Sequence, residues 1–205
     1  RWGISEKFML IISVSIVFFL AATFLISQRV FRQYAIRSAD ELALTILDQT
    51  DKRLAQFFRE MQYLVRGLAE TRAVRDAEPV AMRDLFLATV RTRASHMRAI
   101  YLGTADGRMF EWGVGEGFVN NAPSFPPDYD PRKRPWYQLA VDSKGFAVSA
   151  PYRYASVDAL GITCVLPVLA ADGSLAGVLG LDILIEDLVN ILADIEIPSG
   201  ARPSS

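Results

Sequence analysis

The sequence has very little of the residue types that build metal and covalent sites: one cysteine and one histidine in 205 residues. A single cysteine, Cys164, excludes an internal disulfide and a cysteine-based zinc site. It lies in the apolar run "ITCVLPV", where a small buried side chain is the expected role. His96 has no cluster of carboxylates or cysteines around it, which argues against a metal site and a hydrolase triad. We therefore expect no metal, no cofactor, no catalytic residue and no enzyme activity; a fused output enzyme would lie outside this sequence.

The sequence also lacks an excess of charge of either sign. Its 22 lysine and arginine residues stand against 23 aspartate and glutamate residues, for a net charge of -1 at pH 7. A nearly neutral chain has no basic footprint for nucleic acid, so we expect no nucleic-acid partner. The apolar fraction, by contrast, is 51%, and one segment supplies much of it.

That segment, residues 8–27, reads "FMLIISVSIVFFLAATFLIS" and contains no charge, proline or glycine. At about 1.5 Å per residue, a helix of this length crosses a hydrocarbon core of about 30 Å. A cleaved signal peptide is the alternative, but the run is longer than the usual apolar region of about 7–15 residues, and no convincing small-x-small cleavage site follows it. We expect a transmembrane helix over 8–27 and a cytoplasmic N-terminal fragment over 1–7. Arginine and lysine occur on both sides, so their count does not decide the orientation.

A second helical pattern follows over residues 28–72, without a proline. Its apolar residues recur in steps of three and four, which is typical of one face of a helix: Ala39, Leu42, Ala43, Ile46, Leu47, Leu54, Phe57, Phe58, Met61, Leu64, Val65 and Leu68. One interpretation is an amphipathic helix that packs on its own domain. The length of the pattern and its continuation from the apolar segment favour a stalk that pairs with a second copy, so we predict a homodimer through this helix.

From residue 73 the pattern changes to short elements. Ala105-Asp106-Gly107 is a tight-turn signal between two β-rich runs, and Pro79 fits the first turn of a helix. In order, we expect a helix over 79–93, a strand pair over 97–112, a loop over 113–127, a short helix from Pro131 or Pro135, strands within 146–154, 160–170 and 175–183, and a helix over 185–195. This order predicts an α+β fold with a five-stranded antiparallel meander and helices on one face.

Several runs occur together in a specific order: "YLGTADG", "YDPRKRPWY", "APYRY", "GITCVLPV" and "DGSLAGVLGLDI". With the apolar segment and long helix in front, this combination resembles the extracytoplasmic Cache sensor modules of bacterial receptors, and in particular the membrane-distal half of a double Cache domain. The resemblance implies a PAS-like sensor module over 73–197 and a tail over 198–205 that leads to a missing downstream region. It also implies signal transduction, an inner-membrane location with the sensor in the periplasm, and a cytoplasmic output domain as partner.

The resemblance further implies a ligand. One subset of double Cache domains binds free amino acids through a pattern of six residues, and the matching positions here are Tyr129, Arg134, Trp136, Tyr137, Tyr152 and Asp182. The chemistry fits, because Arg134 can hold a carboxylate through two parallel hydrogen bonds and Asp182 can balance an ammonium group. Tyrosine hydroxyls and the indole N–H add further polar contacts. A ligand without either charged end would leave one of these groups unpaired.

Ordinary structural roles exist for the same residues. Arg134 could pair with Asp128 or Asp130, Asp182 could cap the helix that follows, and the aromatic rings could simply cover a loop. At the level of function, the alternatives are a Cache module for another small amine or carboxylate, and a membrane-tethered dimerisation module without a ligand. Selectivity for the ligand side chain would come from the loop over 113–125 and from the hairpin residues Tyr101, Met109, Glu111 and Trp112.

Overall fold

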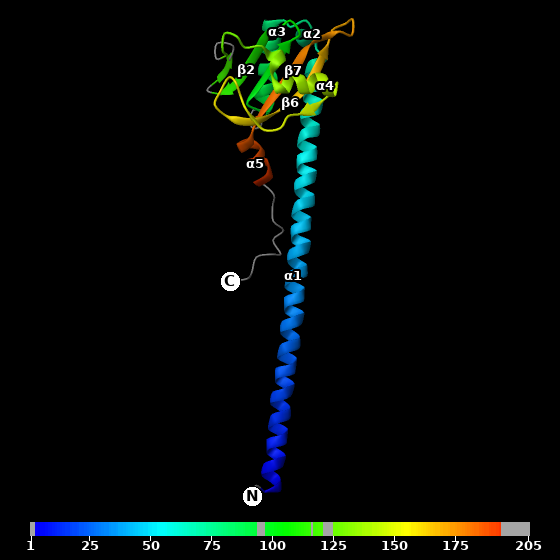
Figure 1. Cartoon of the computed structure of the whole chain (residues 1–205), viewed down its shortest axis with the longest axis vertical. Coiled ribbons are helices and arrows are strands. Elements are labelled where there is room, and N and C mark those ends of the chain that lie inside the picture. Colours follow the sequence, from blue (N-terminus) through cyan, green and yellow to red (C-terminus); the bar gives the residue numbers. More distant parts are fainter. Residues whose placement is uncertain (1–2, 94–96, 116, 121–124, 194–205) are drawn as a thin grey trace. The chain divides into compact units, whose positions relative to one another are not determined.

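The computed structural model describes residues 3–93, 97–115, 117–120 and 125–193. The chain divides into two compact units, Arg1–Thr50 and Asp51–Ser205. Helix α1 (Ile4–Ala69) begins in the first unit and ends in the second. Figure 1 labels the main elements and colours them by their position along the chain.

In the first unit, α1 carries the apolar segment over 8–27. Its large side chains are exposed, with Phe18 at 76% and Phe24 at 62%. The hydroxyl of Thr23 donates to the carbonyl of Phe19 over 3.0 Å, so this polar group is satisfied within the helix, as a lipid environment requires. Among the described helices, α1 is the one long and apolar enough to cross a membrane, judged by length and composition.

In the second unit, the last turns of α1 belong to the core. Phe57, Met61, Val65 and Leu68 are buried, and they pack with the sheet and with helices α2 (Arg72–Arg75) and α3 (Pro79–Arg93). This part of the apolar stripe therefore serves its own domain rather than a second copy, because its side chains are already covered. The helix predicted over 79–93 is confirmed with the same bounds.

The sheet is antiparallel throughout and does not follow the predicted meander. Its strands are β1 (Ala99–Thr104), β2 (Met109–Gly115), β3 (Gly117–Asn120), β4 (Ala147–Val148), β5 (Tyr152–Arg153), β6 (Leu160–Leu169) and β7 (Leu175–Leu184). The order is β3-β2-β1-β7-β6-β4, and β5 also pairs with β6. The first and last long strands, β1 and β7, pair with each other in the middle of the sheet, and both are buried along most of their length. Part of the predicted loop is also wrong, since β2 and β3 occupy it; residues 116 and 121–124 lie outside the described part.

Helices cover both faces of the sheet, so the prediction of helices on one face was wrong. The end of α1, with α2 and α3, covers the face of Ile100, Leu102 and Leu181. Helix α4 (Pro135–Ser143) covers the other face, over Ala99 and Val178 (Figure 1). The reason is the strand alternation, because successive side chains on β1 and β7 point to opposite faces and both sets are mostly apolar. A short 3-10 helix, η3 (Pro131–Lys133), precedes α4, and helix α5 (Ile185–Ala193) follows β7.

Candidate functional site

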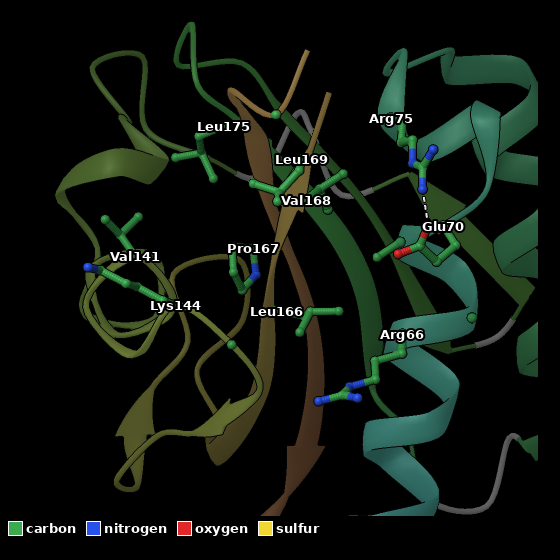
Figure 2. Close-up of a pocket in the computed structure, with 14 residues that line it drawn as sticks. Arg66, Glu70, Arg75, Val141, Lys144, Leu166, Pro167, Val168, Leu169 and Leu175 are labelled. Atoms are coloured by element: carbon green, nitrogen blue, oxygen red, sulfur yellow. Dashed lines mark hydrogen bonds and ion pairs between the residues drawn. The ribbon is translucent and has the colours of Figure 1, made fainter. Parts of the chain in front are cut away.

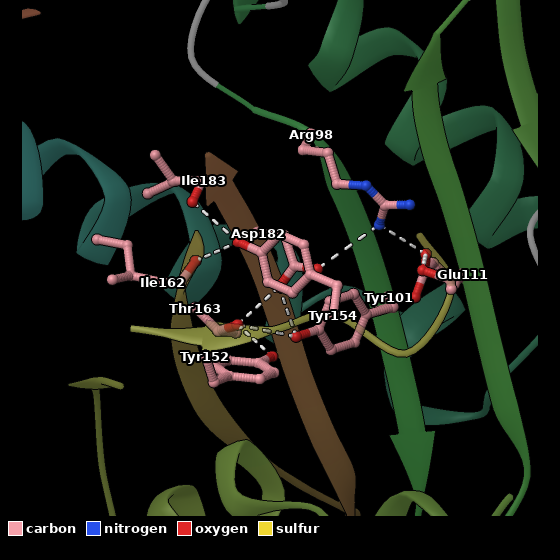
Figure 3. Close-up of polar contacts among 10 residues, drawn as sticks. Arg98, Tyr101, Glu111, Tyr152, Tyr154, Ile162, Thr163, Asp182 and Ile183 are labelled. Carbon is pink, nitrogen blue, oxygen red and sulfur yellow. Dashed lines mark hydrogen bonds and ion pairs between the residues drawn. The ribbon is translucent and has the colours of Figure 1, made fainter. Parts of the chain in front are cut away.

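A cluster of buried polar side chains lies on the face of the sheet that α4 covers. The strand registers place Glu111 opposite Tyr101, and Thr163 opposite Asp182. Residues paired across antiparallel strands point to the same face. All four side chains are buried, with Asp182 at 2% exposure and Glu111 at 3%. Polar groups so deep in a sheet need partners, and Figure 3 shows the contacts among them.

A small cavity opens above this cluster, and its volume is about 10 Å³, close to what one buried water needs. Five of the six predicted ligand residues line it, namely Tyr129, Arg134, Trp136, Tyr152 and Asp182. The other lining residues are Tyr101, Met109, Glu111, Phe125, Tyr154, Ala155 and Ser156. An amino acid would therefore enter only after the lining moves apart, because the side chains themselves nearly fill the space.

Tyr137 is the predicted residue that the cavity lining does not include. It follows Trp136 at the start of α4, and the two rings meet edge to face with centroids 5.6 Å apart. A Cβ added at Gly103 would lie 2.7 Å from Trp136 and 3.3 Å from Tyr137. Glycine at position 103 thus lets both rings pack closely on β1, and Tyr137 supports the ring that does line the cavity.

Arg134 lies between η3 and α4, and it lines the cavity. Its Nε atom is buried and has no hydrogen-bond partner among the described residues. Its guanidinium carbon lies 5.7 Å from the centroid of the Tyr129 ring. The neighbouring Asp130 pairs with Arg132 instead, with Arg132 Nε 2.9 Å from Asp130 Oδ1. A buried donor without a partner is energetically costly and rare, so we expect this nitrogen to donate to an anion when a ligand is bound.

Asp182 faces the cavity from β7. Its Oδ1 accepts hydrogen bonds from Tyr101 over 2.8 Å and from Thr163 over 2.6 Å, while its Oδ2 lies 3.6 Å from Arg98 Nη1. These contacts hold the carboxylate on the sheet, so it does not act as the cap of α5. Burial, and then the negative charge of Glu111, raise the pKa of Asp182 to about 7.

Tyr152 reaches this carboxylate indirectly. Thr163 has one hydroxyl hydrogen, and its short bond to Asp182 uses it. Tyr152 Oη lies 2.7 Å from Thr163 Oγ1, so Tyr152 must be the donor of that bond. Burial and the charge of Asp182 raise the pKa of Tyr152, which keeps it a neutral donor. Burial also raises the pKa of Tyr129, to about 12.

A buried ion pair stands beside Asp182, and sequence reasoning did not find it as a pair. Arg98 Nη1 donates to Glu111 Oε1 over 2.8 Å, and Ser156 Oγ donates to the same oxygen over 2.7 Å. The backbone N–H of Arg98 donates to the carbonyl of Asp182 over 2.8 Å, which fixes the two residues side by side. The one sequence signal was an arginine placed directly before a continuous apolar strand.

Two further tyrosines complete the site. Tyr154 Oη lies 2.8 Å from the carbonyl oxygen of Ile162 and 2.8 Å from that of Ile183, and its one hydrogen is shared between them (Figure 3). Tyr101 crosses over Gly180, its partner on β7, and a Cβ at position 180 would collide with the ring. Glycine there lets the Tyr101 hydroxyl reach Asp182, which gives a physical reason for the glycine of "GLDI".

The predicted selectivity residues divide between the two faces. Tyr101, Met109 and Glu111 line the cavity. Trp112 does not, which corrects that expectation: it lies on the opposite face and packs against Phe86, with ring centroids 5.6 Å apart. Alternation along β2 is the reason, because neighbours of Glu111 must point the other way. Within the predicted loop, Phe125 lines the cavity.

A larger groove of about 810 Å³ lies elsewhere in the second unit. Figure 2 shows β6 residues Leu166 to Leu169 between Val141 and Lys144 on one side and the Glu70–Arg75 ion pair on the other. None of the six predicted ligand residues lines it. We take the smaller cavity as the candidate site because the buried polar groups converge there.

Comparison with known proteins points to bacterial chemoreceptors. Residues 96–190 match the family model of the first PDC sensor domain of methyl-accepting chemotaxis protein-like receptors. The chain is 27% identical over 191 residues to the methyl-accepting chemotaxis protein PscA of Pseudomonas syringae pv. tomato, covering 93% of this chain and 28% of that protein. The chain thus spans less than a third of the length of this relative.

Solved structures show the same architecture. The ligand-binding domain of the Pseudomonas aeruginosa PAO1 amino acid chemoreceptor PctC, in complex with GABA, superposes with a TM-score of 0.58 at 28% identity, covering 72% of this chain and 64% of that one. The corresponding domain of PctB from the same organism, in complex with L-Gln, gives 0.59 at 26% identity, covering 71% and 55%. The chain is therefore homologous to the sensor domains of methyl-accepting chemotaxis receptors. The two structural neighbours above are ligand-binding domains of amino acid chemoreceptors, solved in complex with GABA and with L-Gln.

Proposed function

We propose that this chain is the extracytoplasmic sensor part of a bacterial chemoreceptor, of the double Cache type, that binds a free α-amino acid. The ligand occupies the cavity between the sheet and the Tyr129–Trp136 segment. One observation carries the proposal: Arg134 and Asp182, a cation and a carboxylate, line the same buried cavity. A zwitterion supplies the opposite charge to each of them.

Each end of the ligand meets a defined set of groups. The carboxylate binds Arg134, whose buried Nε lacks a partner among the described residues, and the Trp136 N–H and Tyr129 hydroxyl are further donors. The ammonium group binds Asp182, which Tyr101 and Thr163 hold in place. Tyr152 supports this end through Thr163, and Tyr137 acts by packing against Trp136.

The proposed site and the last turns of α1 belong to the same compact unit, so a conformational change at the site can reach α1. Ligand shifts the equilibrium between conformations only as far as it binds one of them better. In the proposed receptor, α1 anchors the chain in the inner membrane over 8–27, places the sensor in the periplasm, and pairs with a second copy through the stripe of Ala39, Leu42, Ala43 and Ile46. A cytoplasmic output domain outside this sequence receives the signal.

The test is calorimetric titration of the full 205-residue chain in lipid nanodiscs with the twenty L-amino acids. At least one should bind, and Arg134→Ala should weaken that binding by roughly thirtyfold or more, the effect of losing about 2 kcal/mol. Lys133→Ala is the matched control, because it removes the same charge one residue away at an exposed position outside the lining.

Circular dichroism first establishes that both variants are folded. Arg134→Lys keeps the charge but loses the planar fork, so it should also bind more weakly than the parent chain. No binding of any amino acid, or Arg134→Ala binding as well as Lys133→Ala, would rule out the pocket. A ligand-free dimerisation module predicts that outcome.

A further inference from the structure

The formal charges at the candidate site balance. Glu111, Arg134 and Asp182 line the cavity, and Arg98 lies behind it in contact with both carboxylates. Two cations therefore face two carboxylates. An amino acid with an uncharged side chain is itself neutral, so it preserves this balance. A charged side chain adds one buried charge without a counter-charge among these four groups.

We infer that the buried Arg98–Glu111 pair determines ligand selectivity, and that the site takes α-amino acids with uncharged side chains. The inference rests on the proposed amino-acid function and specifies its ligand class. It assigns a role to two residues outside the six-residue pattern.

An acidic side chain is disfavoured by Glu111. That carboxylate is 3% exposed and lines the cavity, so a second carboxylate beside it would be desolvated next to a like charge. Both charges would be removed from water, and like charges repel each other more strongly in the protein interior than at the surface. The other lining residues near the loop, Met109, Phe125 and Ala155, offer apolar contact instead of a cation.

A basic side chain is disfavoured because Glu111 already has its cation. Its Oε1 accepts from Arg98 and from Ser156. A ligand cation would have to share Glu111 with the guanidinium of Arg98, which is 8% exposed and tied by its backbone to Asp182. Arg98 cannot withdraw into solvent without breaking these contacts.

The pair also protects the ammonium site. Arg98 Nη1 lies 2.8 Å from Glu111 but 3.6 Å from Asp182, so Glu111 holds the guanidinium away from the carboxylate that the ligand needs. Without Glu111, Arg98 would pair with Asp182 and compete with the ammonium group. Glu111 is thus a positioning residue for Asp182 as well as a filter for side-chain charge.

The experiment compares ligands of similar shape and different charge on the full chain in nanodiscs, at pH 8. The probes are all twenty L-amino acids and L-ornithine, which is a cation. The matched comparisons are L-asparagine with L-aspartate and L-glutamine with L-glutamate. We expect the tightest ligand to be neutral, and every charged amino acid to bind about tenfold or more weakly. An acidic or basic amino acid that binds within tenfold of the best neutral one overturns the inference.

Three variants test the pair directly. Arg98→Met leaves an excess negative charge, so the affinity for L-ornithine relative to the best neutral amino acid should rise about tenfold. In Glu111→Gln, the affinity for the acidic amino acids relative to the best neutral one should rise about tenfold. The double variant Arg98→Met with Glu111→Gln restores the balance and should restore the neutral preference. The double variant also controls for folding, because replacing both partners of a buried pair is tolerated better than removing one.

The outcomes separate the two proposals. If no amino acid binds the parent chain, the proposed function fails. If amino acids bind but the charge ratios of the single variants do not change, or all three variants lose every ligand equally while circular dichroism shows them folded, the pair is only structural. In those cases the selectivity inference fails while the proposed function stands.

Discussion

At the scale of single residues, the proposed contact between Asp182 and the ligand would couple binding to protons. Burial and the charge of Glu111 raise its pKa to about 7, and an ammonium group is held best by the ionised carboxylate. Arg98, Tyr101 and Thr163 contact the same carboxylate. Its charge therefore changes near neutral pH.

We expect ligand affinity to rise between pH 6 and pH 8 and binding near pH 7 to release protons. The measurement is calorimetry at pH 6, 7 and 8 in two buffers with different ionisation enthalpies. The difference between the apparent enthalpies gives the number of protons released. A flat affinity and equal enthalpies in the two buffers would mean that Asp182 is already ionised, or that it does not meet the ammonium group.

The raised pKa of Asp182 also predicts that the folded state loses stability as pH rises toward neutrality. Its pKa of about 7 in the folded chain lies above the ordinary aspartate value of about 3.9, so the folded state binds the proton more tightly. The stability that this tighter proton binding gives to the folded state is fully present below the ordinary aspartate pKa. It is lost as pH rises through about 7.

Asp182→Asn keeps an acceptor for Tyr101 and Thr163 without the buried charge. We expect this variant to unfold at a higher temperature than the parent chain at pH 8, and the difference to shrink toward pH 4. Thermal unfolding of both chains at the two pH values measures it. A parent chain that is the more stable one at pH 8 would show that Arg98 fully offsets the carboxylate. Binding should be lost in the variant, so a gain in stability would accompany a loss of function.

At the scale of elements, the apolar stripe of α1 is covered along one part and largely uncovered along another. From Phe57 to Leu68 the stripe is covered by its own domain. In the first unit, no contact within the described chain buries Ala39, Leu42, Ala43 or Ile46 completely. These four residues have the spacing of one helix face, which is the face a second copy would cover.

Cysteine crosslinking in membranes tests this face. We expect Leu42→Cys and Ile46→Cys to form disulfide-linked dimers on mild oxidation, several-fold more than Glu41→Cys. Helical geometry puts Glu41 on the opposite side from Ala39, which makes it the control. Cys164 is buried and is present in all three variants, so it does not affect the comparison between them. Equal crosslinking at all three positions would indicate collision rather than a specific dimer.

At the scale of the whole molecule, ligand binding to the folded chain should be measurable as added stability. A ligand that binds only the folded chain, at one hundred times its Kd, adds about 2.7 kcal/mol. For a chain of this size, that corresponds to about 5–10 °C in the unfolding temperature.

We therefore expect a thermal shift of this size with the best L-amino acid, and none with that ligand in Arg134→Ala. Differential scanning fluorimetry on the purified chain measures it. The amine and the carboxylic acid that each lack one charged end serve as matched controls, and both should give much smaller shifts. A shift as large with either fragment would favour the alternative of a Cache module for a simple amine or carboxylate.

Much of this organisation could be predicted from the sequence, because local periodicity and turn chemistry fix it. The helix over 79–93, the turn at Asp106-Gly107 and the strand ending in "GLDI" were all legible from spacing and residue type. The α+β class followed from their order. The six-residue pattern also came from the sequence, and five of its members line one cavity.

The tertiary structure alone decided which elements meet. Periodicity shows which residues share a face but not what covers that face. It could not tell that the stripe of α1 becomes buried from Phe57 onward, or that α4 covers the face of the sheet opposite to α2 and α3. The pairing of β1 with β7 joins segments about 80 residues apart and, together with the pairing of β1 with β2, brings Arg98 and Glu111 to Asp182. Long-range pairing is set by burial summed over the whole domain, and no local pattern encodes that sum.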